Sequence, residues 1–208
     1  MPELSSPADA QIGTSEDDDT PFVSRCRQGE TEAFSYLVRR HQKKMLNLAY
    51  RMIGDYEESC DVVQEAFLSA FRSLKSFRKE ARFSTWLGSI VLNHSKDHLK
   101  KKAVRLRLEE KSLDDPKPAG GNSLNGWSSP EISVLEQMEK RDVERLVQQA
   151  LEMLDNEQRE VLVLRDIHGL SYDEMALMLK LPMGTVRSRL FRARTALKDK
   201  LVRVRGAL

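Results

Sequence analysis

The residues of this chain with the clearest chemical potential are arginines near its C-terminus. The stretch from Lys180 to Leu208 holds nine Lys or Arg residues and a single acid, Asp199. Guanidinium groups attract phosphate and can form paired hydrogen bonds to guanine, so this composition is typical of a DNA-binding surface. Four side chains in the stretch have types suited to reading a DNA groove: Arg187, Ser188, Phe191 and Arg192.

Local sequence rules predict the elements that must position these side chains. Ser171 and Glu174 have the spacing of a capping box, so a helix is expected to begin at Tyr172. Pro182 then interrupts the chain and starts a second helix, because proline fits the first turn of a helix and disrupts its interior. Apolar residues at spacings of three and four give this second helix a core face: Val186, Leu190, Ala193, Leu197 and Leu201. These signals together predict a helix-turn-helix.

The rest of the chain shows helical patterns and no alternating strand pattern. Helical periodicity and capping residues predict helices over 20–28, 31–54, 56–74, from Ser84 into the basic run Lys100 to Lys102, and over 157–167. Residues 112–130 are rich in Pro, Gly, Ser and Asn, which predicts a flexible linker, and the acidic residues 1–19 are expected to be a disordered tail. The predicted fold is all-α, with two small helical domains over 20–111 and 131–208.

Composition narrows the class of protein. The chain has 208 residues, of which 40% are hydrophobic and 32% are charged, as in ordinary globular proteins. It has no apolar run long enough to span a bilayer and no signal-peptide pattern, so we expect no membrane insertion and a cytoplasmic location. Cys26 and Cys60 lack metal-ligand spacing and are expected to be reduced thiols. The net charge of +2 hides a segregation of charge, since 131–160 carries nine acids and four bases.

Three sequence motifs occur in a fixed order along the chain. They are Asp61-Val62-Val63-Gln64-Glu65-Ala66-Phe67, then Phe83-Ser84-Thr85-Trp86-Leu87 followed by Asn93, then Gly184-Thr185-Val186-Arg187-Ser188-Arg189-Leu190-Phe191-Arg192-Ala193-Arg194. This series resembles the extracytoplasmic-function sigma factors of bacterial RNA polymerase, and the resemblance spans about Phe22 to Val202. It implies a sigma factor that binds core RNA polymerase, directs it to specific promoters and helps to open the DNA, without enzyme activity or a cofactor.

The resemblance also assigns the two domains and a polymerase-binding face. It implies that 20–111 is a region 2 domain, which binds core polymerase and recognises and melts the minus-ten element, and that 131–208 is a region 4 domain. Asp61, Gln64 and Glu65 are expected to dock on the coiled coil of the polymerase largest subunit, and the polymerase flap is a further expected contact. Many relatives are held inactive by an anti-sigma factor, which is therefore among the partners that the resemblance implies.

The expected contacts with promoter DNA fall in both domains. An unstacked minus-ten base needs an aromatic platform and a polar partner, and basic residues must hold the strand. The residues expected to serve the minus-ten element are Phe77, Trp86, Asn93, Lys96 and Lys100, with Phe77 exposed in a polar loop and Trp86 in a supporting position. Arg187, Ser188, Phe191 and Arg192 are expected to contact the minus-thirty-five element, with Arg165 bound to a phosphate.

Two other functions compete with this interpretation. His94 and His98 lie four residues apart with Asp97 between them, a spacing that can bind zinc, but no third ligand follows at a convincing distance. They are therefore predicted to be surface histidines, and no metal site is expected. A free-standing DNA-binding regulator with a sensing domain would also account for the C-terminal half. However, 21–111 show helices and a polar loop rather than the pattern of a ligand-binding domain.

Overall fold

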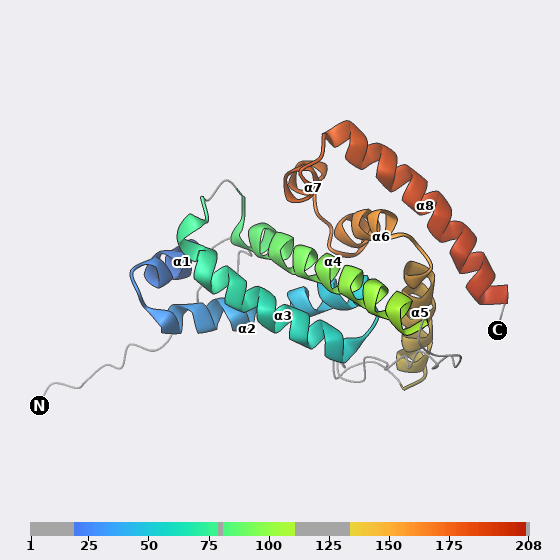
Figure 1. The fold of residues 1–208 in the computed structure, drawn as a ribbon, viewed down its shortest axis with the longest axis horizontal. Helices are drawn as coiled ribbons and strands as arrows, with labels where there is room; N and C mark the ends of the chain where they lie inside the picture. Colours follow the sequence, from blue (N-terminus) through green and yellow to red (C-terminus); the bar gives the residue numbers. More distant parts are fainter. Residues whose placement is uncertain (1–18, 79–80, 111–133, 207–208) are drawn as a thin grey trace, which may run out of the picture.

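The computed structural model describes residues 19–78, 81–110 and 134–206, and all regular elements in these ranges are helical (Figure 1). The N-terminal half contains α1 (Thr20–Arg27), α2 (Thr31–Ile53), α3 (Tyr56–Ser73) with a 3-10 turn (Leu74–Ser76), and α4 (Phe83–Glu110). The C-terminal half contains α5 (Val134–Glu152), α6 (Asn156–Leu162) with a π-helical turn (Val163–Ile167), α7 (Tyr172–Leu179) and α8 (Met183–Gly206). The predicted all-α class is confirmed, whereas the predicted linker 112–130 and tail residues 1–18 lie outside the described residues.

Capping residues begin and end several helices as the sequence predicts. Gly54 ends α2 with a left-handed backbone, φ 87°, which glycine adopts without a steric penalty. Before α7, the Ser171 backbone N–H donates to Glu174 Oε2 at 2.8 Å, and the Glu174 N–H donates to Ser171 Oγ at 3.2 Å. The capping box and the helix start at Tyr172 are therefore confirmed.

The core of the N-terminal half lies between α2, α3 and α4; α3 and α4 run side by side in Figure 1, and α2 packs against both. Its largest fully buried side chains include Leu37, Leu48, Met52 and Leu87. Asp19, which we expected in the disordered tail, is instead only 5% exposed, and its Oδ2 lies 2.8 Å from His41 Nε2. A carboxylate buried in this way needs a partner, and the histidine of α2 supplies one.

The two halves pack against each other through α2 and α4 on one side and α5, α6 and α7 on the other, and we call this contact the inter-half interface. Arg159 of α6 is 6% exposed and donates to the backbone carbonyl of Met52 in α2. Gln148 of α5 is 4% exposed and donates to the Tyr50 carbonyl at 3.3 Å. The charged and polar groups buried here are thus bonded to backbone from the opposite half, as buried polar groups generally must be.

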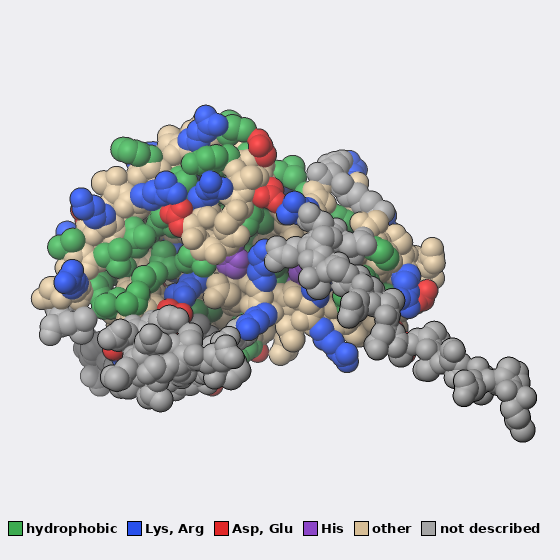
Figure 2. Space-filling model, turned by 180° about the vertical axis from the view of Figure 1, so that it is seen from behind, with side chains coloured by type: hydrophobic (Ala, Val, Ile, Leu, Met, Phe, Trp, Pro, Cys, Tyr) green, Lys and Arg blue, Asp and Glu red, His purple; other side chains and the backbone are tan. Residues whose placement is uncertain are grey.

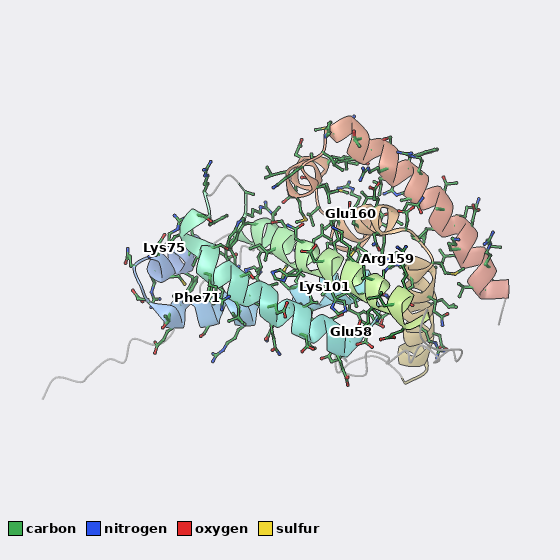
Figure 3. The ribbon with its side chains drawn as sticks, in the orientation of Figure 1. Glu58, Phe71, Lys75, Lys101, Arg159 and Glu160 are labelled. Atoms are coloured by element: carbon green, nitrogen blue, oxygen red, sulfur yellow. The ribbon has the colours of Figure 1, made fainter. Side chains whose placement is uncertain are left out.

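A second part of the inter-half interface joins α4 to the C-terminal helices. Lys96 Nζ lies 3.0 Å from Glu160 Oε2, and Thr85 Oγ1 donates to Glu174 Oε1 at 3.3 Å. Figure 3 shows Glu160 and Arg159 on α6, where it passes close to α4 and α5. A Cβ placed on Gly88 would lie 3.2 Å from the terminal methyl of Met178, so α4 and α7 approach closely at this glycine. None of the described helices is long and apolar enough to cross a membrane.

Candidate nucleic-acid interface

Helix α3 carries one exposed polar face opposite its buried face. Asp61, Gln64 and Glu65 are all exposed, while Val62 and Ala66 are buried against the neighbouring helices. The Glu65 side chain is 70% exposed, and its Oε2 lies 3.7 Å from His94 Nδ1. The structure therefore brings the three predicted polymerase-binding residues together on one accessible surface.

This polar face continues into apolar side chains that sequence reasoning missed. Leu68 is 55% exposed and Phe71 is 40% exposed. The Phe71 ring, labelled in Figure 3, packs edge-on against Phe34, with 5.0 Å between the two ring centroids. Both residues follow Gln64 at helical spacing, which is the signal that could have placed them on the exposed face. A rigid helix that presents carboxylates beside apolar side chains has the composition of a protein-binding surface.

The aromatic residues near the start of α4 form a cluster, and this corrects the prediction for Phe77. Phe77 was expected to be exposed in a polar loop, but it is 6% exposed. Its ring centroid lies 5.9 Å from that of Phe83 and 5.0 Å from that of Trp86, and Arg27 donates to its carbonyl. The prediction of exposure is wrong because the Phe77 ring packs against the rings of Phe83 and Trp86. Trp86 is half-buried, so it is the more accessible of the two rings.

The predicted minus-ten residues of α4 lie on one side of the helix. Trp86, Asn93 and Lys100 are seven residues apart, which is about two helical turns, so they share a face. Asn93 and Lys100 are exposed, and Lys100 Nζ lies 3.8 Å from Asp97 Oδ1. Lys96 lies at the edge of this face and is paired with Glu160 from the C-terminal half. An amide, an aromatic ring and ammonium groups are therefore available along one helix face.

The predicted minus-thirty-five residues lie on the exposed side of α8. Arg187, Ser188, Phe191 and Arg192 are exposed, whereas Val186, Leu190 and Ala193 on the opposite side are buried. The predicted division of this helix into a core face and an outer face is thus confirmed. Phe191 is 75% exposed, the highest exposed fraction among the large apolar side chains of the described residues.

Arginines from two elements, the π-helical turn and α8, gather beside the helix-turn-helix. The Arg165 guanidinium lies 4.9 Å from the ring centroid of Tyr172, and the Arg187 guanidinium lies 5.4 Å from the same centroid. Arg194 of α8 pairs with Asp166 through two hydrogen bonds of 3.0 and 2.5 Å. Figure 2 shows Lys and Arg side chains spread over one face of the molecule, among hydrophobic ones on the side where the C-terminal helices lie. This combination of charge and apolar surface suits a nucleic-acid backbone with its base edges.

The histidines of α4 are engaged with α3. His94 Nε2 lies 3.0 Å from Ser69 Oγ, and His98 Nε2 lies 3.1 Å from Glu58 Oε2. Burial disfavours the charged form of Glu58, but hydrogen bonds from Lys102 and His98 outweigh it and lower its pKa. In the part of the chain that the structure describes, no cluster of three or more His, Cys, Asp or Glu side chains could hold a metal ion.

The chain is similar to known proteins along nearly its whole length. Family models described as Sigma-70 region 2 and Sigma-70, region 4 match residues 37–105 and 144–197. The chain is 37% identical over 187 residues to the RNA polymerase sigma-H factor of Pseudomonas aeruginosa, covering 89% of this chain and 95% of that protein. It is 37% identical over 186 residues to the ECF RNA polymerase sigma-E factor of Escherichia coli K12, covering 88% and 94%. The solved complex of CnrH with the cytosolic domain of CnrY has a TM-score of 0.61 at 26% identity, covering 89% of this chain and 97% of CnrH.

Proposed function

The chain belongs to the extracytoplasmic-function sigma factors, which direct RNA polymerase to promoters, and we propose that it divides this work between its two halves. In this proposal 20–111 acts as the region 2 domain and binds both polymerase and the minus-ten element. Residues 131–208 act as the region 4 domain and bind the minus-thirty-five element, with 112–130 as the linker. The separation of the exposed polar face of α3 from the arginine-rich face of α8 supports this division.

Polymerase binds the α3 face in this proposal. Asp61, Gln64 and Glu65 pair with basic side chains on the coiled coil of the largest subunit, and Leu68 and Phe71 extend the contact with apolar area. The exposed position of all five side chains on one helix supports this role. A charged rim around apolar anchors is the usual composition of a specific protein interface. The polymerase flap contacts the region 4 domain.

The minus-ten element binds at the start and along the face of α4. Trp86 offers the accessible ring for an unstacked base, and Phe77 supports it from below, since the two centroids are 5.0 Å apart. Asn93 supplies donors and acceptors to a base edge, and Lys96 and Lys100 hold phosphates. The burial of Phe77 thus changes its proposed contribution from the platform itself to the support that fixes the platform.

The outer face of α8 reads the minus-thirty-five element, and the observation that carries this proposal is the 75% exposure of Phe191 between two arginines. An exposed ring can cover a thymine methyl, and Arg187 and Arg192 can each pair with a guanine. Ser188 contacts a base edge or a phosphate, and Arg165 contacts a phosphate. Arg192→Ala should lose about 1 to 3 kcal/mol at one base position only. A uniform loss with all promoter variants in the same rank order would contradict base reading by Arg192.

We further infer that the protein performs no catalysis of its own, acts in the cytoplasm and has a protein regulator. CnrH, which shares this fold, was solved with the cytosolic domain of CnrY bound. An anti-sigma factor that covers the α3 or α8 face would block the proposed contacts directly. Co-purification of the full chain with the products of neighbouring genes tests for this regulator. If none of them forms a stable complex with the chain, the inference of a protein regulator fails and polymerase remains the proposed partner.

One experiment tests the whole proposal. The full chain is combined with core RNA polymerase and genomic DNA, and the starts of the resulting transcripts are sequenced. We expect a limited set of starts that share two sequence elements at a constant distance upstream. Transcription that is no more selective than that of core polymerase alone would refute the proposal.

A further inference from the structure

One aromatic ring lies between arginines that come from separate elements of the C-terminal half. Tyr172 is the first residue of α7, Arg165 belongs to the π-helical turn, and Arg187 belongs to α8. Both guanidinium carbons lie within 6 Å of the Tyr172 ring centroid, at 4.9 Å and 5.4 Å. These distances are those of cation–π contacts, in which the negative face of the ring attracts the cation.

The ring itself has little freedom to move. Tyr172 follows the capping residue Ser171, whose reciprocal hydrogen bonds with Glu174 fix the first turn of α7. The Tyr172 side chain is also partly buried against the hydrophobic core. Because both its backbone and its side chain are constrained, the ring can act as a fixed reference point for the longer side chains around it.

The two arginines differ in how they are otherwise held. Arg165 Nη1 donates to the Leu170 carbonyl at 2.6 Å, so this guanidinium is anchored at both the ring and the backbone. Arg187 is exposed. An exposed arginine samples many rotamers, and it loses this conformational entropy when its side chain is fixed against a base. A contact with a fixed ring restricts those rotamers before DNA arrives.

We propose that Tyr172 is a positioning residue for promoter recognition. Its ring holds the guanidinium groups of Arg165 and Arg187 at a set separation, so that one meets a phosphate while the other meets a base edge. This inference rests on the proposed base-reading role of the α8 face and adds to it the element that orients the reader. The ring attracts both guanidinium groups, which as like charges repel each other.

The experiment compares three replacements of Tyr172 in the full chain assembled with core polymerase. Tyr172→Phe keeps the ring and removes the hydroxyl, Tyr172→Trp keeps a larger ring, and Tyr172→Leu removes the aromatic face. Tyr36→Leu, a matched change at an exposed tyrosine of α2, is the control. Each holoenzyme is titrated with the native promoter and with versions altered at each base of the upstream element, and the thermal unfolding midpoint of each variant is recorded.

We expect Tyr172→Phe and Tyr172→Trp to bind the native promoter within about twofold of the unaltered protein, because both keep the cation–π contacts. Tyr172→Leu should lose about tenfold in affinity for the native promoter and much less for the promoter altered at the base read by Arg187. Its discrimination at that one position should therefore fall. A fold defect shared by all three replacements would appear as a lowered unfolding midpoint in each, and the rescue by Phe and Trp separates the ring from the fold.

Other outcomes overturn the inference. Equal losses in Tyr172→Phe and Tyr172→Leu would assign the effect to the hydroxyl group, and unchanged discrimination in Tyr172→Leu would show that the ring orients nothing. Arg187→Ala is measured in parallel. If Arg187→Ala retains full discrimination between promoter variants, the proposed base-reading role of Arg187 fails. If Arg187→Ala loses discrimination and Tyr172→Leu keeps it, only the positioning role of Tyr172 is refuted.

Discussion

Replacing Arg159 with methionine is expected to destabilise the protein far more than its position on a short helix suggests. The Arg159 side chain is 6% exposed and donates to the carbonyls of Leu151, Glu152, Leu154 and Met52. Three of these carbonyls lie at or just after the C-terminus of α5, and the fourth lies in the last turn of α2. Helix C-termini leave carbonyls without intrahelical partners, so one guanidinium completes the ends of two helices.

The expected loss of stability is the difference between the hydrogen bonds that Arg159 makes and the cost of burying its charge. A hydrogen bond to a charged group contributes about 1.5 kcal/mol at the lower end of its range, so four of them give about 6 kcal/mol. Burial of the guanidinium lowers the pKa of Arg159. The desolvation penalty of a buried ion is several kcal/mol, so removal of the charge recovers on the order of half of that sum. The net loss for Arg159→Met is therefore about 3 kcal/mol in the free energy of unfolding. Methionine keeps the apolar stem, so little of this loss comes from packing.

Urea denaturation followed by circular dichroism measures this loss. Arg145→Met is the matched control, because the Arg145 side chain is 63% exposed and pairs with Asp142 on the surface of α5. Such pairs contribute little, so the control should lose less than about 0.5 kcal/mol. An Arg159→Met loss as small as that of the control would refute the reasoning, since it would mean that water reaches these carbonyls and that the inter-half interface is open in solution.

Charge reversal at Asp61 and Glu65 should weaken binding to core polymerase by about tenfold with an unchanged unfolding midpoint, because both carboxylates are exposed; a fluorescence titration with unchanged affinity would contradict the docking role. Phe77→Leu and Asn93→Ala holoenzymes should bind duplex promoter yet give little permanganate reactivity at start-site thymines, and a premelted template should restore transcription. Near-normal melting by both variants would place base capture elsewhere. Burial, followed by two nearby cationic side chains, lowers the pKa of His168 to about 4. The unfolded chain binds this proton near pH 6.5, so stability should fall as the pH falls from 6.5 towards 4, and urea titrations of His168→Gln should show a shallower decline.

Features set by neighbouring residues could be predicted from the sequence. The capping box of Ser171 and Glu174, the stop at Gly54 and the two faces of α8 depend on spacing within one or two helical turns. Their physical causes are local hydrogen bonds and helical periodicity, which any reader of the sequence can apply. The exposed residues of the proposed polymerase and minus-thirty-five surfaces were placed correctly for the same reason.

Features set by distant residues could not be predicted in this way. Phe77 is buried because Phe83 and Trp86 lie beside it, and its polar neighbours in the chain gave no sign of that cluster. Arg159 bonds to Met52 across 107 positions, and Lys96 to Glu160 across 64. Such partners are selected by how helices pack, and no spacing rule within one segment reports them.

The ion pair between Lys96 and Glu160 has a consequence for how salt affects DNA binding. A free lysine at a DNA phosphate displaces a mobile cation from the DNA. Each such contact adds about 0.7 to 0.9 to the negative slope of the logarithm of the binding constant against the logarithm of the salt concentration. Lys96 already has a counterion, Glu160, which is 4% exposed and covalently part of the same chain. When Lys96 exchanges this carboxylate for a phosphate, Glu160 keeps Arg189 as a neighbour, since Arg189 Nη1 lies 3.9 Å from Glu160 Oε1. Any cation that Glu160 takes up from solution offsets the cation that the DNA releases. The contact then adds less to the salt dependence than a free lysine would, and a measured salt slope would count fewer phosphate contacts than the protein makes.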